Sequence, residues 1–226
     1  MFKRIVYFFA VLFIFAAVSG CSFGNAAYSG IAGYSEAANA RTLYAGLDSG
    51  HFYTRDNSTD RITEEFTFMY RSDGNLVYSR MGDDGEKVRY EFHNGSEINY
   101  RESGDEEWEF IQQGDEDYHV YTQNDPHPYT TEGVISVNAY ALTGSKVEEI
   151  DGGLKITFYY NAAQLAASLA EVGELDSFES TLWLNEEGYC CRLDQKAVFD
   201  DGKLVSDYSM FIDRMNEVAE LTRPEI

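Results

Sequence analysis

Basic side chains are scarce in this chain of 226 residues. Its 17 Lys and Arg residues stand against 39 Asp and Glu residues, which gives a formal net charge of −22. A surface of that charge repels the phosphates of nucleic acids and the headgroups of anionic membranes. We therefore exclude a nucleic-acid partner, and we interpret acidic runs such as 106–107, 115–117 and 148–149 as solvated surface.

Recognisable catalytic motifs are lacking as well. The sequence has no Gly-x-Ser-x-Gly, no Ser-x-x-Lys, no phosphate-binding loop and no dinucleotide-binding fingerprint. Carboxylates are too numerous for a glycosidase pair to be singled out. An enzyme without a recognisable motif is the alternative, but we predict that the chain is not an enzyme and that it uses no cofactor.

A metal site is not predicted either. The four histidines, His51, His93, His119 and His127, are scattered, and no two of them have the spacing of metal ligands. The acidic run 115–117 offers weak Ca²⁺ ligands at most, because the spacing of an EF-hand loop is absent.

Cysteines number only three, Cys21, Cys190 and Cys191. Adjacent residues of a strand point to opposite faces, so Cys190 and Cys191 cannot easily form a disulfide with each other. We predict two free thiols, with Cys191 buried and Cys190 pointing outward.

The N-terminal segment has the order of a bacterial export signal. Lys3 and Arg4 precede an apolar stretch over residues 5–18, which is shorter than the ~20 residues that a transmembrane helix needs. The sequence Val18-Ser19-Gly20-Cys21 then resembles the lipobox of bacterial lipoproteins, in which the cysteine thiol receives a diacylglycerol. The alternative is an ordinary signal peptide followed by an unrelated cysteine.

This interpretation fixes the expected organisation of the chain. Residues 1–20 are a lipoprotein signal peptide that is removed, residues 21–34 are the lipidated Cys21 with a flexible tether rich in small polar residues, and residues 35–226 are one domain. Acyl chains, palmitate among them, would anchor the protein to the cell membrane, exposed outside the cytoplasm, or to the outer membrane if the host has one.

Apolar and polar residues alternate with period two through most of this domain. Segments such as 88–93, 154–160, 178–184 and 191–199 show it clearly, which is typical of antiparallel strands with one solvated face. Asp-Gly and Asn-Gly turns separate them. Helices are expected over residues 35–47, with Ser35 as N-cap, over 161–171, with Asn161 as N-cap, and over 130–143.

These elements predict a mainly β (α+β) fold. About ten strands form a curved antiparallel meander, because a sheet of that size curls. Two or three helices would then plug the concave face of a half-barrel.

The plan resembles the LolA/LppX-like superfamily of bacterial lipoproteins. The resemblance covers residues 35–224 and is carried by the lipobox, a short helix, strands joined by Asp-Gly hairpins with a rhythm of Tyr and Trp, and three long C-terminal strands. It implies a half-barrel that holds acyl chains or lipid-modified partners.

We therefore expect a non-catalytic, membrane-anchored protein that binds an apolar ligand, a lipid or acyl chain, in a concave cavity. The alternative is a cell-envelope scaffold that binds another protein and whose core is filled by its own side chains. The candidate cavity residues are the apolar side chains of the expected concave face: Phe66, Phe68, Tyr70, Tyr90, Phe92, Tyr100, Trp108, Phe110, Ile156 and Phe158.

Overall fold

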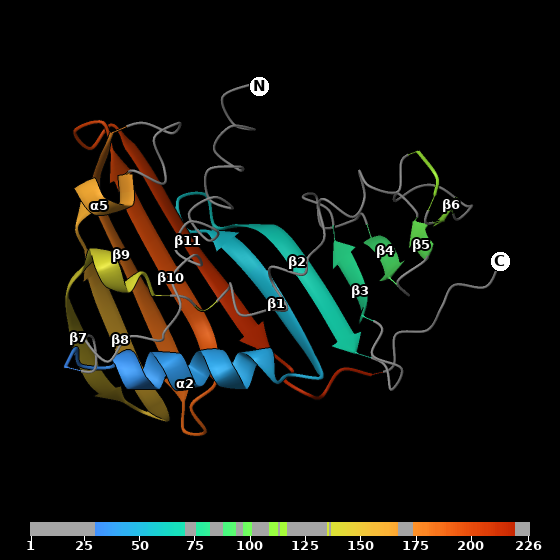
Figure 1. The fold of residues 1–226 in the computed structure, drawn as a ribbon, viewed down its shortest axis with the longest axis horizontal. Helices are drawn as coiled ribbons and strands as arrows, with labels where there is room; N and C mark the ends of the chain where they lie inside the picture. The colour runs from blue at the N-terminus through green and yellow to red at the C-terminus, as the bar shows by residue number, and fades with distance from the viewer. Residues whose placement is uncertain are drawn as a thin grey trace. The chain divides into compact units, whose positions relative to one another are not determined.

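The computed structural model describes residues 30–70, 76–81, 88–93, 97–100, 109–112, 114–116, 135, 137–166 and 174–219 (Figure 1). The helical elements are α2 (Tyr34–Ala45), the 3₁₀ turn η2 (Ala139–Ala141) and α5 (Ala162–Ala166). The strands are β1 (Ser49–Asp56), β2 (Arg61–Tyr70), β3 (Leu76–Met81), β4 (Val88–His93), β5 (Glu97–Tyr100), β6 (Glu109–Gln112), β7 (Leu142–Ile150), β8 (Gly153–Tyr160), β9 (Leu175–Asn185), β10 (Cys190–Phe199) and β11 (Leu204–Asp213).

The strands follow the order β6-β5-β4-β3-β2-β1-β11-β10-β9-β8-β7, so eleven strands take the place of the ten or so that were expected. Sequence neighbours pair antiparallel, as β2 does with β3 and β9 with β10. Among the strands described, the order starts at β6 and ends at β7, so the sheet is not closed. The predicted mainly β, antiparallel meander with few helices is confirmed.

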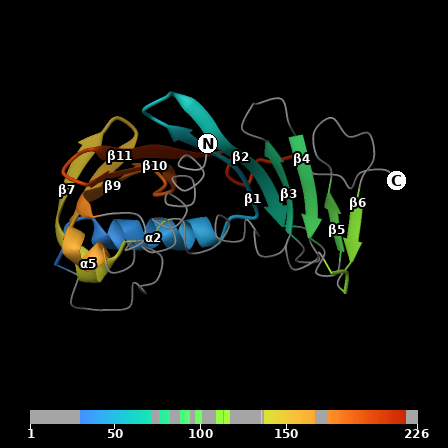
Figure 2. The same ribbon diagram turned by 90° about the horizontal axis from the view of Figure 1, so that it is seen from above.

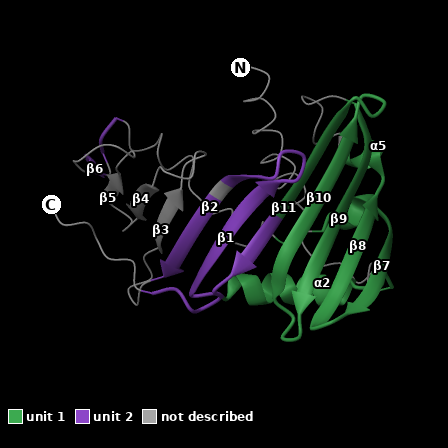
Figure 3. Cartoon of the chain, turned by 180° about the vertical axis from the view of Figure 1, so that it is seen from behind, with its two compact units in different colours: residues 1–46, 127–209 green, residues 47–126, 210–226 purple. Residues whose placement is uncertain are grey.

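The chain divides into two compact units (Figure 3). Unit 1 comprises residues 1–46 and 127–209, and unit 2 comprises residues 47–126 and 210–226. Strand β11 is shared, because the division falls between Ser209 and Met210. A single domain over residues 35–226 stays a prediction.

In unit 1, α2 and α5 lie on the same side of strands β7–β10 (Figures 1 and 2). Gly33 lets α2 begin close to the sheet, since a Cβ there would lie 2.9 Å from Cγ2 of Val147 and still nearer to Ile156. Its φ of 77° also favours glycine. Ser145 donates a hydrogen bond of 2.7 Å to the carbonyl of Ala32, which fixes the chain just before the helix.

The helix predicted over residues 35–47 is found as α2, and the one predicted over 161–171 is found as α5, with residues 167–171 lying outside the described residues. Ser35 was wrongly expected to cap the first one, because Gly33 occupies the N-cap and makes no side-chain bond, while the Ser35 hydroxyl bonds to Glu36. Asn161 does cap α5, where its side chain accepts the N–H of Gln164 at 3.2 Å. Of the described residues, no helix is long and apolar enough to span a membrane.

The prediction of a helix over residues 130–143 is wrong for its C-terminal part. Only Ala139–Ala141 is helical there, as a 3₁₀ turn, and β7 begins at Leu142. The β-branched residues Thr143 and Val147 favour a strand, and pairing with β8 overrides the weak helical pattern before it. Residues 130–134 and 136 lie outside the described residues.

Unit 2 has aromatic residues on both faces of its strands. On one face Phe52 stacks on Phe66, with ring centroids 5.0 Å apart. On the other, Tyr53 of β1 stacks on Phe211 of β11 at 4.8 Å, and the guanidinium of Arg55 lies 5.2 Å from the Phe211 ring. These contacts hold β1 between its neighbours in the strand order.

Candidate functional site

The face of β8–β10 that looks toward α2 is almost entirely apolar, and we call it the inner face of unit 1. Cross-strand partners share a face, so the registers Ile156 with Leu182 and Leu182 with Leu193 align three strands. The described side chains of this face are Leu154, Ile156, Phe158, Tyr160, Leu175, Phe178, Ser180, Leu182, Leu184, Cys190, Leu193, Gln195, Ala197 and Phe199.

All of these side chains except the half-buried Leu154 are buried. Ile156 and Phe158 have no exposed surface, and Leu182 and Ala197 keep 1%. The helical side of unit 1 adds further buried apolar side chains, Ile135, Val137, Ala139, Ala141 and Leu165. The inner face is therefore shielded from solvent, which both an ordinary core and an apolar binding surface require.

The predicted cavity residues are divided between the units. Ile156 and Phe158 belong to the inner face of unit 1. Phe66 and Phe68 are buried in unit 2, where Tyr70 and Phe110 are half-buried. Trp108 lies outside the described residues.

Within unit 2, the strand register places the predicted cavity residues on two opposite faces of the sheet. Position 68 pairs with 78, and 78 with 91, whereas position 92 pairs with 77, and 77 with 69. Positions 90 and 92 (Tyr90 and Phe92) therefore fall on the face of the sheet opposite to Phe66 and Phe68. By the same pairing, position 110 (Phe110) shares the face of position 92, and position 100 (Tyr100) shares the face of position 68.

A short polar row crosses the otherwise apolar inner face. The hydroxyls of Tyr160 and Ser180 are 3.0 Å apart and buried, and Gln195 stands directly opposite Ser180 on β10. Oε1 of Gln195, a residue with 7% of its surface exposed, has no hydrogen-bond partner among the residues described. Burial raises the pKa of the Tyr160 phenol, and the Ser180 hydrogen bond offsets only part of that rise. Sequence alternation places Gln195 on this face, but it gives no partner for it.

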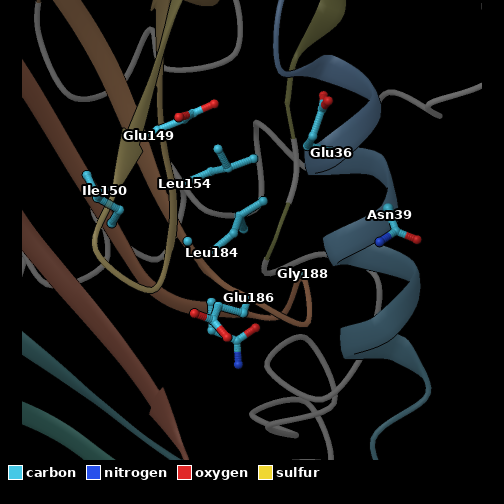
Figure 4. Close-up of a pocket in the computed structure, with 10 residues that line it drawn as sticks. Glu36, Asn39, Glu149, Ile150, Leu154, Leu184, Glu186 and Gly188 are labelled. Carbon is cyan, nitrogen blue, oxygen red and sulfur yellow. The ribbon is translucent and has the colours of Figure 1, made fainter.

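A pocket of about 360 Å³ opens at one end of the inner face of unit 1 (Figure 4). Ile150, Leu154 and Leu184 form its apolar part. The carboxylates at its rim belong to Glu36 of α2, Glu149 of β7 and Glu186 of the β9–β10 turn. No Lys or Arg is among its lining residues. Such a rim disfavours a ligand with an anionic headgroup.

The opposite, outer face of unit 1 carries a cluster of polar side chains that bond to one another. Trp183 lies between two cations, with Lys155 Nζ 4.8 Å and Arg192 Cζ 5.2 Å from its ring. Asp194 accepts hydrogen bonds from the Trp183 indole at 2.9 Å, from Arg192 Nε at 2.6 Å and from the Ser209 hydroxyl at 2.6 Å. Because these groups satisfy one another, the cluster holds β8–β11 together and offers little to a ligand.

His51 is a second buried polar centre, in unit 2. Its Nδ1 lies 2.7 Å from Asp213 and its Nε2 lies 2.9 Å from Glu65. Spacing along the sequence gave no sign of this cluster, since Asp213 is 162 residues away. The contacts connect β1 with β2 and β11.

The two C-terminal cysteines are free, and their predicted orientation is wrong. Cys190 is buried and Cys191 is half-buried. A β-bulge between Cys190 and Arg192 shifts the register against β9, which inverts the alternation at this point. Burial is the main cause that raises the pKa of Cys190, to about 12, and burial also raises the pKa of Cys191.

Within the described part of the chain, no group of three His, Cys, Asp or Glu side chains is placed to hold a metal ion. Asp115, from the acidic run considered for Ca²⁺, accepts the backbone N–H of Gln112 at 2.7 Å and so closes a local turn.

Comparison with known proteins gives structural matches only. No protein-family model and no curated protein match the chain. Among solved structures it is similar to the lipoprotein LppX of Mycobacterium tuberculosis, with 16% identity over 83% of this chain and 97% of the other and a TM-score of 0.47. It is similar to LprF from Mycobacterium bovis, with 12% identity over 84% and 95% of the two chains and a TM-score of 0.49. MucB in complex with MucA(peri) matches with 12% identity over 79% and 55% and a TM-score of 0.33. At these identities the likeness concerns the fold alone.

Proposed function

We propose that this chain is an exported, membrane-anchored lipoprotein without catalytic activity, and that it binds an apolar ligand, a lipid or acyl chain, on the inner face of unit 1. Ile156 and Phe158 are the predicted cavity residues on that face. The remaining predicted residues, in unit 2, stay a proposal for a second contact surface.

The observation that carries this proposal is the inner face itself. Three neighbouring strands present apolar side chains in register, with no Asp, Glu, Lys or Arg among those described. Burying an acyl chain needs a contiguous apolar surface, and each Å² removed from water contributes roughly 25 cal/mol.

Anchoring is supported by the sequence alone. A signal segment followed by Cys21 is the arrangement in which the thiol receives diacylglycerol. Two or more acyl chains hold a protein stably at a membrane, whereas one chain does so only marginally.

The second candidate is an envelope-protein scaffold whose inner face is filled by its own side chains. The burial of Leu165, Val137 and Ala141 on the helical side favours this candidate, because these side chains can fill the space next to the inner face themselves. The two candidates differ in whether space for a ligand remains on the inner face.

Substitution of Ala197 by Leu tests this difference. Ala197 lies on the inner face opposite Phe178 and is 1% exposed. The assay uses the mature chain, residues 21–226 with Cys21→Ser so that it carries no lipid, and the neutral probe N-phenyl-1-naphthylamine. This unlipidated chain keeps every contact described above, since all are made from Gly30 onward.

We expect the wild-type chain to bind the probe, and Ala197→Leu to weaken binding about 10-fold with little loss of stability, because the added carbons occupy ligand space. A filled core would instead be overpacked and lose about 1–3 kcal/mol of unfolding free energy. Val205→Leu, at an exposed position of β11, is the matched control. A wild-type chain that binds no probe would overturn the proposal.

A further inference from the structure

The polar row Tyr160–Ser180–Gln195 interrupts an apolar surface at its centre. Ser180 pairs in register with Phe158 on one side and Gln195 on the other, so the row crosses three strands. All three side chains are at least nine-tenths buried. A polar group in such a place is costly unless it is hydrogen-bonded.

The polar groups of the row do not all find hydrogen-bond partners within the row. Tyr160 and Ser180 have two hydroxyl protons and spend one of them on their mutual bond of 3.0 Å. The other proton has no acceptor among the described residues, and Gln195 Oε1 has no donor. Beside the amide N–H groups of Gln195, the row therefore has one spare hydroxyl donor, on Tyr160 or Ser180, and one spare acceptor, Gln195 Oε1.

A hydroxyl group matches this pair, because it accepts one hydrogen bond and donates another. A carboxylate only accepts, and it would bring a charge to a face that has no described Lys or Arg. An ether oxygen accepts but cannot donate to Gln195. A pure hydrocarbon does neither.

Resting on the apolar-ligand function proposed above, we propose that the row Tyr160–Ser180–Gln195 is a polar subsite for the hydroxyl of a neutral, hydroxyl-bearing amphiphile. The Tyr160 or Ser180 hydroxyl donates to the ligand oxygen, and the ligand hydroxyl donates to Gln195 Oε1. The apolar side chains around the row hold the hydrocarbon part. The same surroundings raise the pKa of Tyr160, in keeping with a site that disfavours negative charge.

The test compares three ligands of equal chain length in competition with N-phenyl-1-naphthylamine on the unlipidated mature chain. They are 1-dodecanol, its methyl ether and dodecanoate. We expect dodecanol to displace the probe at about 10-fold lower concentration than the ether or dodecanoate, because only dodecanol satisfies both spare groups.

Gln195→Met keeps the size of the side chain and removes the acceptor. We expect it to abolish the preference for dodecanol over the ether. In the absence of ligand its thermal midpoint should be equal to or above that of wild type, since an unpaired acceptor is removed. Ser180→Ala, which removes one of the two hydroxyls, should reduce the same preference.

Thr181→Val is the matched control, because Thr181 lies on the other face of β9 and bonds to Thr157 at 3.0 Å. It should lower stability and leave the ligand preference unchanged. If all three ligands compete equally and Gln195→Met changes nothing, the row is no subsite, although the apolar-ligand function stands. If none of the three displaces the probe and the probe itself does not bind, the proposed function fails as well.

Discussion

The indole N–H of Trp183 donates to Asp194 on the neighbouring strand at 2.9 Å, and this bond lies at the centre of the outer-face cluster. Asp194 also accepts hydrogen bonds from Arg192 and Ser209. One carboxylate thus connects three strands.

We predict that Asp194→Ala lowers the unfolding free energy by about 2–3 kcal/mol, since it leaves Arg192 and the Trp183 indole without their acceptor. Urea titration followed by tryptophan fluorescence, in a Trp108→Phe background, measures the loss. Glu148→Gln is the control, because the Glu148 carboxylate pairs with Lys146 on the surface at 2.8 Å and such surface pairs contribute little. Equal losses in the two variants would contradict the central place of Asp194.

Gly152, in the turn between β7 and β8, and Gly153, the first residue of β8, need glycine for different reasons. Gly152 has a φ of 78° with open space around it, whereas a Cβ on Gly153 would overlap the backbone carbonyl of Leu184. Gly152→Ala should therefore cost about 1–2 kcal/mol, the strain of the left-handed conformation. Gly153→Ala should cost clearly more, because β8 and β9 must separate. Circular dichroism melts of both variants test this ranking, and a milder effect at position 153 would refute it.

The thiol of Cys190 should be inert in the folded chain. Its pKa of about 12 leaves almost no thiolate at pH 8, and the side chain is buried. We expect iodoacetamide at pH 8 to modify Cys191 slowly, and Cys190 only after unfolding in urea. Mass spectrometry of the single variants Cys190→Ala and Cys191→Ala separates the two sites. Rapid modification of Cys190 under native conditions would contradict its burial.

The period-two pattern was enough to predict β8, β9 and β10 and the inner face that they form, because a half-buried strand imposes its alternation on the sequence. Asn161 was also identifiable as a cap. Cys190 and Cys191 were assigned the wrong way round, because a single β-bulge inverts the alternation and leaves no signal in the sequence.

The candidate cavity was harder to predict than the strands. Tyr90 and Phe92 fall opposite to Phe68 because strand register, rather than the pattern within one strand, decides which faces coincide. Strand β3 has apolar residues on both faces, so its sequence does not determine that register. The carboxylate pocket and the His51 cluster join residues distant in the chain, which no local pattern indicates.

Lipid attachment at Cys21 gives a separate prediction. In a bacterial host, Cys21→Ser should abolish labelling by radioactive palmitate and release the protein from the membrane fraction. Cys191→Ser should leave both unchanged, because that thiol has no part in anchoring. Persistent labelling of the Cys21→Ser variant would show that the signal segment is of another type.

The central claim, an apolar ligand on the inner face of unit 1, is tested most directly by mass spectrometry of an organic extract. The unlipidated mature chain is purified without detergent and extracted, beside an equal amount of the Ala197→Leu variant. We predict a reproducible amphiphile near one molecule per wild-type chain and much less in the variant. A clean extract from the wild-type chain, together with no binding of the naphthylamine probe, would contradict the claim and favour the scaffold.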